Sequence, residues 1–232
     1  MSHRVIVTRP LREAQGWVGD LCAAGLHAVA LPLIEIQPAD DPAPLQRAWQ
    51  HLADYVGVMF VSANAVEGFF ASKPPSAPSF GIDAAIKTRA WATGPGTAAA
   101  LRRAGVAQQC VDAPAADAAQ FDSEALWRLV GAGIKPAQRV LIVRGGDSQG
   151  ATTAQGVGRD WFAQRVGEAG AVADFVVSYR RARPRLDASH LQLERAAAAD
   201  GSVWLFSSSE ALANLRTSLP GQDWRAARAV AT

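Results

Sequence analysis

The segment Arg4-Val5-Ile6-Val7-Thr8-Arg9 returns later in the chain as Arg139-Val140-Leu141-Ile142-Val143-Arg144. Two further pairs of segments repeat in the same order and at a similar spacing, 60–66 with 206–212 and 89–93 with 228–232. The repeating unit is far longer than that of a solenoid, so it predicts two similar domains. A cleft between two like domains is a natural place for a small-molecule site.

Short apolar runs alternate with segments of helical periodicity along the whole chain. Residues 5–7, 56–61, 90–93 and 140–143 are apolar without alternation, which is typical of strands covered on both faces. Alternating strands and helices give parallel sheets with right-handed crossovers. We therefore expect an α/β fold with two similar doubly wound parallel-sheet domains that arose by internal duplication.

Two extended segments mark the expected domain boundaries. Residues 33–36 before Pro38 resemble residues 176–179 before Pro184, and we expect them to run side by side as a two-stranded linker. The predicted limits are residues 1–34 plus 184–232 for a discontinuous domain, 39–180 for an inserted domain, and 35–38 and 181–183 for the linkers.

Composition excludes several classes of protein. The formal net charge is only +2, so no large basic field indicates nucleic acid. No apolar run approaches the roughly 20 residues that span a bilayer, and no signal peptide is visible. Cys22 and Cys110 are far apart, and the histidines do not cluster with them, which disfavours a metal site. These features predict a cytoplasmic protein that binds neither nucleic acid nor membrane.

Arginine and glycine follow equivalent strands of the repeat. Arg9 follows the first strand, and Arg144, Gly145 and Gly146 follow its counterpart, where residues 145–158 are predicted to form a glycine-rich loop. The loop is either a flexible surface segment or a substrate loop at the carboxyl edge of a sheet, where open α/β sheets bind ligands. The repetition favours a substrate loop, although the part from 150 to 158 has no functional interpretation.

Hydroxyl side chains stand at two equivalent strand-to-helix turns. Ser62 and Asn64 occupy one turn, and Ser207-Ser208-Ser209 occupies the other. They can act as plain helix caps or offer hydroxyl and N–H groups to ligand carboxylates. A serine nucleophile is disfavoured, because neither a Gly-x-Ser-x-Gly elbow nor a nearby histidine accompanies them.

The turn Gly94-Pro95-Gly96-Thr97 is predicted to lead into a helix over residues 98–104. Backbone N–H groups at such a helix start can hold an anion. The turn also resembles a dinucleotide fingerprint. However, Ala99 stands where that pattern needs glycine, and no acidic residue ends a second strand about 20 residues on. A dehydrogenase is therefore disfavoured.

Tyr179 lies at the expected domain crossing, beside the basic run Arg180-Arg181-Ala182-Arg183-Pro184-Arg185. The tyrosine either packs with its hydroxyl in solvent or donates a proton or hydrogen bond to a leaving oxygen, since a phenol is protonated at neutral pH. The basic run is either a solvated linker or, in part, an anion-binding element.

These segments together resemble uroporphyrinogen-III synthase over essentially the whole chain. The resemblance rests on the order and spacing of several motifs rather than on any one of them. They cover residues 5–10, 32–38, 60–66, 94–97, 140–145, 179–184 and 204–211.

The resemblance implies two α/β domains with a two-stranded linker and a cyclising hydro-lyase of tetrapyrrole and heme biosynthesis. Its substrate would be hydroxymethylbilane, a linear tetrapyrrole rich in carboxylates. Loss of water would start a ring closure in which ring D is inverted, giving uroporphyrinogen III. The resemblance implies no metal or organic cofactor, and a monomer.

The resemblance also assigns roles to residues. Tyr179 matches the family's tyrosine, thought to assist loss of the substrate hydroxyl. Substrate contacts are expected from residues at strand ends: Arg9, Ser62, Asn64, Gly94, Thr97, Arg144, Gly145, Gly146, Ser207, Ser208 and Ser209. The rival interpretation is a non-catalytic two-domain protein that binds a small polyanion, which the fold alone does not exclude.

The two expected domains differ in length. Thr93 continues into Gly94 and the following helix, whereas its counterpart Thr232 is the last residue given. Family members usually continue beyond this point with a turn-helix, a strand and a last helix. We therefore expect the discontinuous domain to be truncated at its C-terminus.

Overall fold

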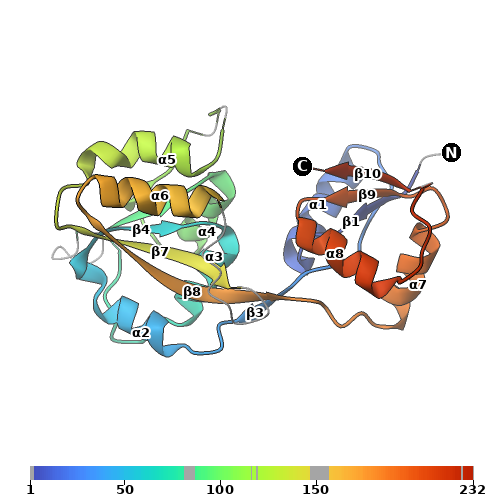
Figure 1. Ribbon diagram of the computed structural model, residues 1–232, viewed down its shortest axis with the longest axis horizontal. Coiled ribbons are helices and arrows are strands. Elements are labelled where there is room, and N and C mark those ends of the chain that lie inside the picture. The colour runs from blue at the N-terminus through green and yellow to red at the C-terminus, as the bar shows by residue number, and fades with distance from the viewer. Residues whose placement is uncertain are drawn as a thin grey trace. The chain divides into compact units, whose positions relative to one another are not determined.

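The computed structural model describes residues 3–80, 87–115, 117–118, 120–146, 157–225 and 227–231. The chain divides into two compact units (Figure 1), Met1–Ile36 with Arg181–Thr232 and Gln37–Arg180. We call them the discontinuous unit and the inserted unit. The sequence-based limits were 34 and 184 for the first and 39 and 180 for the second.

The discontinuous unit contains a parallel sheet of four strands in the order β10-β9-β1-β2. The strands are β1 (Val5–Val7), β2 (Ala28–Ala30), β9 (Val203–Phe206) and β10 (Arg228–Ala231). The described helices are α1 (Leu11–Ala23), α7 (Ala188–Ala197) and α8 (Ser209–Ser218). The chain reverses after α1 at Gly25, whose φ of 82° is the left-handed conformation that glycine adopts readily.

The inserted unit contains a six-stranded sheet in the order β3-β8-β7-β4-β5-β6. Its strands are β3 (Glu35–Pro38), β4 (Tyr55–Phe60), β5 (Arg89–Ala92), β6 (Val111–Asp112), β7 (Arg139–Gly146) and β8 (Val172–Ala182). Its α-helices are α2 (Ala43–Gln50), α3 (Ala63–Ala71), α4 (Pro95–Arg103), α5 (Ser123–Val130) and α6 (Val157–Glu168). The strands from β8 to β6 pair in parallel. β3 is hydrogen-bonded to β8, so the two extended segments around Pro38 and Tyr179 do run side by side.

The four strands of the smaller sheet repeat four strands of the larger sheet with corresponding residue pairs. The strand order β10-β9-β1-β2 corresponds to β5-β4-β7-β8. Val5 lies opposite Val203, just as its counterpart Val140 lies opposite Gly57. The pairing of β9 with β10 follows that of β4 with β5 in the same way. The predicted α/β fold with internal duplication is therefore confirmed.

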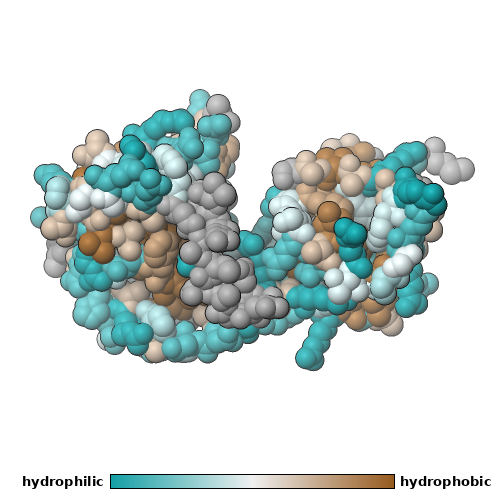
Figure 2. Space-filling view, in the orientation of Figure 1, coloured by the Kyte–Doolittle hydropathy of each residue, from teal (hydrophilic) through white to brown (hydrophobic). Residues whose placement is uncertain are grey.

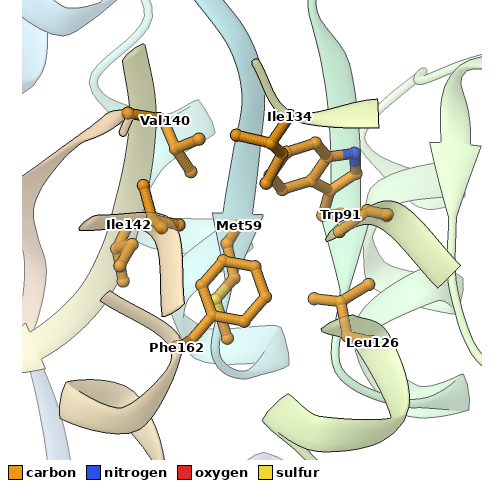
Figure 3. Packing of buried hydrophobic residues seen from close by; sticks show 10 residues of the cluster. Met59, Trp91, Leu126, Ile134, Val140, Ile142 and Phe162 are labelled. Atoms are coloured by element: carbon orange, nitrogen blue, oxygen red, sulfur yellow. The ribbon is translucent and has the colours of Figure 1, made fainter. Parts of the chain in front are cut away.

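The core of the inserted unit covers both faces of its sheet. On one face Met59, Trp91 and Ile142 from three strands pack against Leu126 of α5 and Phe162 of α6 (Figure 3). The rings of Trp91 and Phe162 meet edge to face at 6.3 Å, an arrangement that adds to the gain from burial.

Aromatic side chains fill the space on the α2 and α3 side of the same sheet. Trp49 of α2 stacks on Phe69 of α3 with ring centroids 4.4 Å apart, and Phe60 of β4 meets Phe69 edge to face. The indole N–H of Trp49 donates to the backbone oxygen of Phe69 at 2.9 Å. Helices thus cover this sheet on both sides, as its uninterrupted apolar strands indicate.

Three predicted element limits were wrong. Helix α4 begins at Pro95 rather than at residue 98, because proline suits the first helical position. Strand β7 continues to Gly146, so Gly145 and Gly146 are strand residues and not part of a loop. Helix α6 begins at Val157, inside the predicted 145–158 loop. Most of the predicted 145–158 loop, residues 147–156, lies outside the described residues.

The visible surface of each unit mixes hydrophilic and apolar residues (Figure 2). The large exposed hydrophobic side chains come from several separate elements, among them Leu11 of α1, Leu129 of α5 and Phe175 of β8. In the described part of the chain, no helix combines the length and the apolar character needed to cross a membrane.

Glu194 of α7 lies fully buried in the discontinuous unit. Its Oε2 accepts a hydrogen bond from Ser218 Oγ at 2.8 Å, while Oε1 has no partner among the described residues. Burial raises the pKa of Glu194 above its ordinary 4.5, because desolvation of the carboxylate outweighs the Ser218 hydrogen bond and the nearby Arg183. Its contribution to stability is therefore present in acid and is lost as pH rises through the raised pKa.

We expect Glu194→Gln to flatten the pH dependence of unfolding. The wild-type chain should lose a few degrees more in melting temperature than the variant between mildly acidic and neutral pH, since about 1 kcal/mol moves the midpoint of a chain this long by ~2–4 °C. Thermal unfolding across this pH range measures the difference. The exposed Glu35→Gln is the matched control in the same unit. Parallel pH curves for wild type and Glu194→Gln would contradict the expectation.

Candidate functional site

The carboxyl ends of the parallel strands gather the predicted residues of the inserted unit at one edge of its sheet. Ser62 follows β4, Gly94 follows β5, and Gly145 lies near the end of β7. Tyr179 lies opposite Gly145 in the neighbouring strand β8. This edge is where open α/β sheets bind ligands, and we call these four residues the edge cluster.

Tyr179 is the buried centre of the edge cluster. Its side chain is only 2% exposed, so it does not pack with its hydroxyl in open solvent. The hydroxyl lies 3.3 Å from Ser62 Oγ, and either oxygen can donate the hydrogen. Two residues that are far apart in sequence thus share a hydrogen bond at the end of the sheet.

Gly145 makes room for the ring of Tyr179. A Cβ atom added to Gly145 would lie 2.6 Å from Cζ of Tyr179 and 2.9 Å from its hydroxyl oxygen. Side chains do not approach so closely, so any residue other than glycine would displace the ring. The glycine in this motif therefore serves the placement of the tyrosine.

Ser62 has a second task at the start of α3. Its Oγ accepts the backbone N–H of Ala65 at 3.1 Å and so caps the helix. Its hydroxyl hydrogen remains available to Tyr179 or to a ligand. Asn64 lies in the first turn of the same helix, partly exposed, next to the edge cluster in sequence. Both alternatives foreseen for Ser62, cap and hydroxyl donor, are compatible with this geometry.

Gly94 and Thr97 lie at the start of α4. Gly94 is the N-cap residue, and no side chain caps this helix start. Because α4 begins earlier than predicted, Thr97 lies in its first helical turn. Its side chain is buried there. An uncapped helix start offers its backbone N–H groups to an anion, at the same edge as Tyr179.

Arg144 and Tyr179 lie on opposite faces of the sheet. Successive strand residues point to opposite faces, so Arg144 lies on the face opposite to Gly145. Its side chain is 9% exposed, and its guanidinium lies 4.6 Å from the ring of Phe175. A cation over an aromatic face is stabilised by that ring. Gly146, the last residue of β7, points to the same face as Arg144.

The discontinuous unit carries its own predicted residues at the carboxyl ends of β1 and β9. Arg9 pairs with Glu13 at 3.0 Å and lies over the ring of Trp17, so its charge is engaged by α1, the helix that follows it. Ser208 caps α8 by accepting the N–H of Glu210 at 3.2 Å. The neighbouring serines, 207 and 209, are exposed.

Two arginines of the basic run pair with acidic residues. Arg180 contacts Asp40 at 2.8 Å within the inserted unit, and Arg181 contacts Glu210 at 3.5 Å within the discontinuous unit. Both partners are distant in sequence, so local charge patterning could not predict them. The pairs connect the C-terminal end of β8 to an acidic residue in each unit.

Sequence reasoning missed two residues beside the edge cluster, Gly68 of α3 and Ser178 of β8, which contact one another next to Tyr179. The sequence holds a weak signal for each. Gly68 is a glycine inside a helix, which usually has a packing reason. Ser178 is the polar residue in the apolar run 175–179.

Among the described residues, no group of three or more His, Cys, Asp or Glu is placed to hold a metal ion. The fold and the edge cluster define an internally duplicated α/β protein whose candidate site lies at strand carboxyl ends around a buried tyrosine. The chain belongs to the uroporphyrinogen-III synthase family, because the family model described as Uroporphyrinogen-III synthase HemD matches residues 15–232.

Individual relatives agree with this family. A uroporphyrinogen-III synthase of Chlorobaculum parvum is 34% identical over 104 residues, which are 44% of this chain and 39% of that protein. The alignment thus spans well under half the length of this curated relative.

Two solved structures share the fold. Uroporphyrinogen III synthase of Thermus thermophilus, a mutant form, has a TM-score of 0.53 at 16% identity over 99% of this chain and 84% of its own. The Helicobacter pylori uroporphyrinogen-III synthetase has a TM-score of 0.50 at 14% identity over 100% of this chain and 84% of its own.

Proposed function

We propose that the chain is a uroporphyrinogen-III synthase that cyclises hydroxymethylbilane with inversion of ring D and loss of water. Membership of the family supports this activity. The observation that carries it is the Tyr179 hydroxyl, held against Ser62 at the carboxyl edge of a parallel sheet. One buried hydroxyl at a ligand-binding edge fits a reaction that needs a single proton donor.

In the proposed reaction, Tyr179 acts on the hydroxymethyl group of the substrate. The C–O bond breaks, and the oxygen leaves as water after taking the phenol proton. The azafulvene that remains is attacked by the substituted carbon of ring D, which gives a spiro intermediate. Fragmentation and recombination invert ring D, and loss of a ring proton as the macrocycle closes restores the phenol.

Most of the catalytic effect would come from holding the substrate in one geometry. Hydroxymethylbilane also closes without an enzyme, to the uninverted isomer, so the protein must favour the inverted product. The uncapped start of α4, with Gly94 and Thr97, would receive carboxylates on backbone N–H groups. In the discontinuous unit, Ser207 and its neighbours would offer hydroxyl groups. Arg9 and Arg144 stay candidates, although each already contacts an aromatic ring of its own unit.

The same proposal places the enzyme in the cytoplasm as a monomer without metal or organic cofactor. Cys22 and Cys110 are both free thiols, which fits a reducing compartment. Size-exclusion chromatography with light scattering measures the oligomeric state, and a stable dimer would contradict the monomer.

The proposed function is tested with freshly made hydroxymethylbilane. The porphyrinogens are oxidised, and isomers III and I are separated by chromatography. An excess of isomer III over the protein-free control supports the synthase. Isomer I alone, at the protein-free rate, refutes it and favours the non-catalytic binder.

Ser62→Ala separates the two tasks of Ser62. Removal of a serine cap costs ~1 kcal/mol, and the substitution also removes the partner of the Tyr179 hydroxyl. The matched control is Asp122→Ala, which removes the cap of α5 in the same unit, where Asp122 accepts the N–H of Ala125 at 2.8 Å. Both variants should unfold at a similarly lower temperature, but only Ser62→Ala should also slow isomer III formation. Equal turnover in the two variants would show that Ser62 is only a cap.

A further inference from the structure

We propose that Ser178 and Gly68 are positioning residues that aim the Tyr179 hydroxyl at Ser62. The proposal deepens the proposed function and rests on it for its catalytic meaning. Its structural part is that a β-bulge in β8, held against helix α3, orients Tyr179. This part depends only on contacts within the inserted unit.

An extra residue in β8 sets the direction of Tyr179. Arg144 lies opposite Val177, but the next residue of β7, Gly145, lies opposite Tyr179. Ser178 is therefore inserted into the pairing as a β-bulge. Because side chains alternate along a strand, a shift of one residue moves the following side chain to the other face. The bulge thus places Tyr179 on the face of Gly145, whereas regular pairing would turn it to the face of Arg144.

Ser178 anchors the bulge to helix α3. Its side chain is 1% exposed, and its Oγ donates to the backbone oxygen of Ala65 at 3.0 Å. The carbonyl of Arg144 lies 3.5 Å from the same Oγ, on the neighbouring strand. The hydroxyl thus connects the bulge of β8 to the helix that Ser62 caps.

Gly68 allows α3 to lie directly against the bulge. A Cβ atom on Gly68 would lie 2.2 Å from the backbone oxygen of Ser178 and 2.8 Å from its carbonyl carbon. Backbone atoms cannot move aside as the end of a flexible side chain can, so any larger residue would push the helix and the strand apart. Glycine costs stability inside a helix, and this close approach is the physical reason for it here.

These contacts connect Tyr179 to helix α3 at two points, through its hydroxyl and through the preceding residue Ser178. Ser62, the N-cap of α3, contacts the tyrosine hydroxyl, and Ala65 and Gly68 of the same helix contact Ser178. The backbone of β8 links Ser178 directly to Tyr179. A movement of α3 away from the bulge would displace Ser62 and would also release Ser178, the residue before Tyr179. The distance between the hydroxyl oxygens of Ser62 and Tyr179 would therefore increase.

The test uses nuclear magnetic resonance of the full chain labelled with [13Cζ]tyrosine. The chain contains only two tyrosines, Tyr55 and Tyr179, so Tyr55 serves as an internal reference. We expect Gly68→Ala and Ser178→Ala to shift the Tyr179 signal and to leave the Tyr55 signal in place. The matched control is Gly167→Ala, a helical glycine of the same unit whose Cβ would meet nothing within 4 Å.

Kinetics with hydroxymethylbilane adds a readout that general destabilisation would not produce. A displaced hydroxyl should lower kcat ~10-fold to 100-fold with little change in KM, since a misplacement of about 1 Å can cost 10²-fold. An unchanged Tyr179 signal in both variants would overturn the proposal. If Gly68→Ala does not fold, Ser178→Ala decides, because it adds no atom. If the wild-type chain makes no isomer III but both variants still shift the Tyr179 signal, the proposed function is refuted and the orienting role stays intact.

Discussion

We expect Tyr179→Phe to lower kcat for isomer III formation about 100-fold, the lower end of the range for a general acid, while KM should change little. The variant keeps the ring over Gly145 but loses the one hydroxyl that reaches Ser62. Since the substrate can close by itself, isomer I should take a larger share of the product. Initial rates and isomer ratios measured in the same reactions test both expectations.

The matched control for Tyr179→Phe is Tyr55→Phe, which removes the other tyrosine hydroxyl. Tyr55 begins β4, at the amino end of the sheet, where it stacks with Arg139. Burial, with help from nearby carboxylates, raises the pKa of Tyr55 above its ordinary 10. Its hydroxyl lies 3.5 Å from a guanidinium nitrogen of Arg139, at the end of β4 opposite to the edge cluster. Isomer III formation at the wild-type rate by Tyr179→Phe would remove Tyr179 from the mechanism.

Gly145→Ala should slow isomer III formation to a similar degree without removing any functional group. The new methyl would overlap the buried ring of Tyr179 at 2.6 Å, so the ring must move. Overpacking of this kind costs ~1–3 kcal/mol of stability, and the displaced hydroxyl loses its alignment with the substrate. Melting temperature and kcat are measured on the same preparation.

The control for Gly145→Ala is Gly133→Ala in the same unit, where an added Cβ meets nothing within 4 Å. It should keep both stability and turnover. A crystal structure of Gly145→Ala with Tyr179 in its original place would contradict the steric explanation.

The repeat made the fold predictable from sequence. Residues 4–9 and 139–144 became the equivalent strands β1 and β7, and even their pairing partners Val203 and Gly57 correspond. This prediction succeeds because an apolar run between helical segments leaves few arrangements other than a parallel strand. The carboxyl-edge position of Ser62, Gly94, Gly145 and Tyr179 follows from the same topology.

The orientation of individual side chains was not predictable. Regular alternation would put Tyr179 on the face of Arg144, and the bulge at Ser178 that reverses this depends on the tertiary contact with Gly68. Arg144 belongs to a repeated motif. Its contact with Phe175 joins two neighbouring strands, and no local sequence pattern indicates it. Sequence identified which residues share an edge, whereas packing decided which of them share a face.

The most direct test of the central claim is the amount of isomer III that each chain produces. Hydroxymethylbilane is supplied in large molar excess, and isomer III is quantified against the concentration of the chain after the substrate is consumed. The account predicts many equivalents of isomer III per wild-type chain. At early times Tyr179→Phe should have formed far less isomer III than the wild-type chain. Isomer III that never exceeds one equivalent per chain, or that forms equally fast without the Tyr179 hydroxyl, would contradict it.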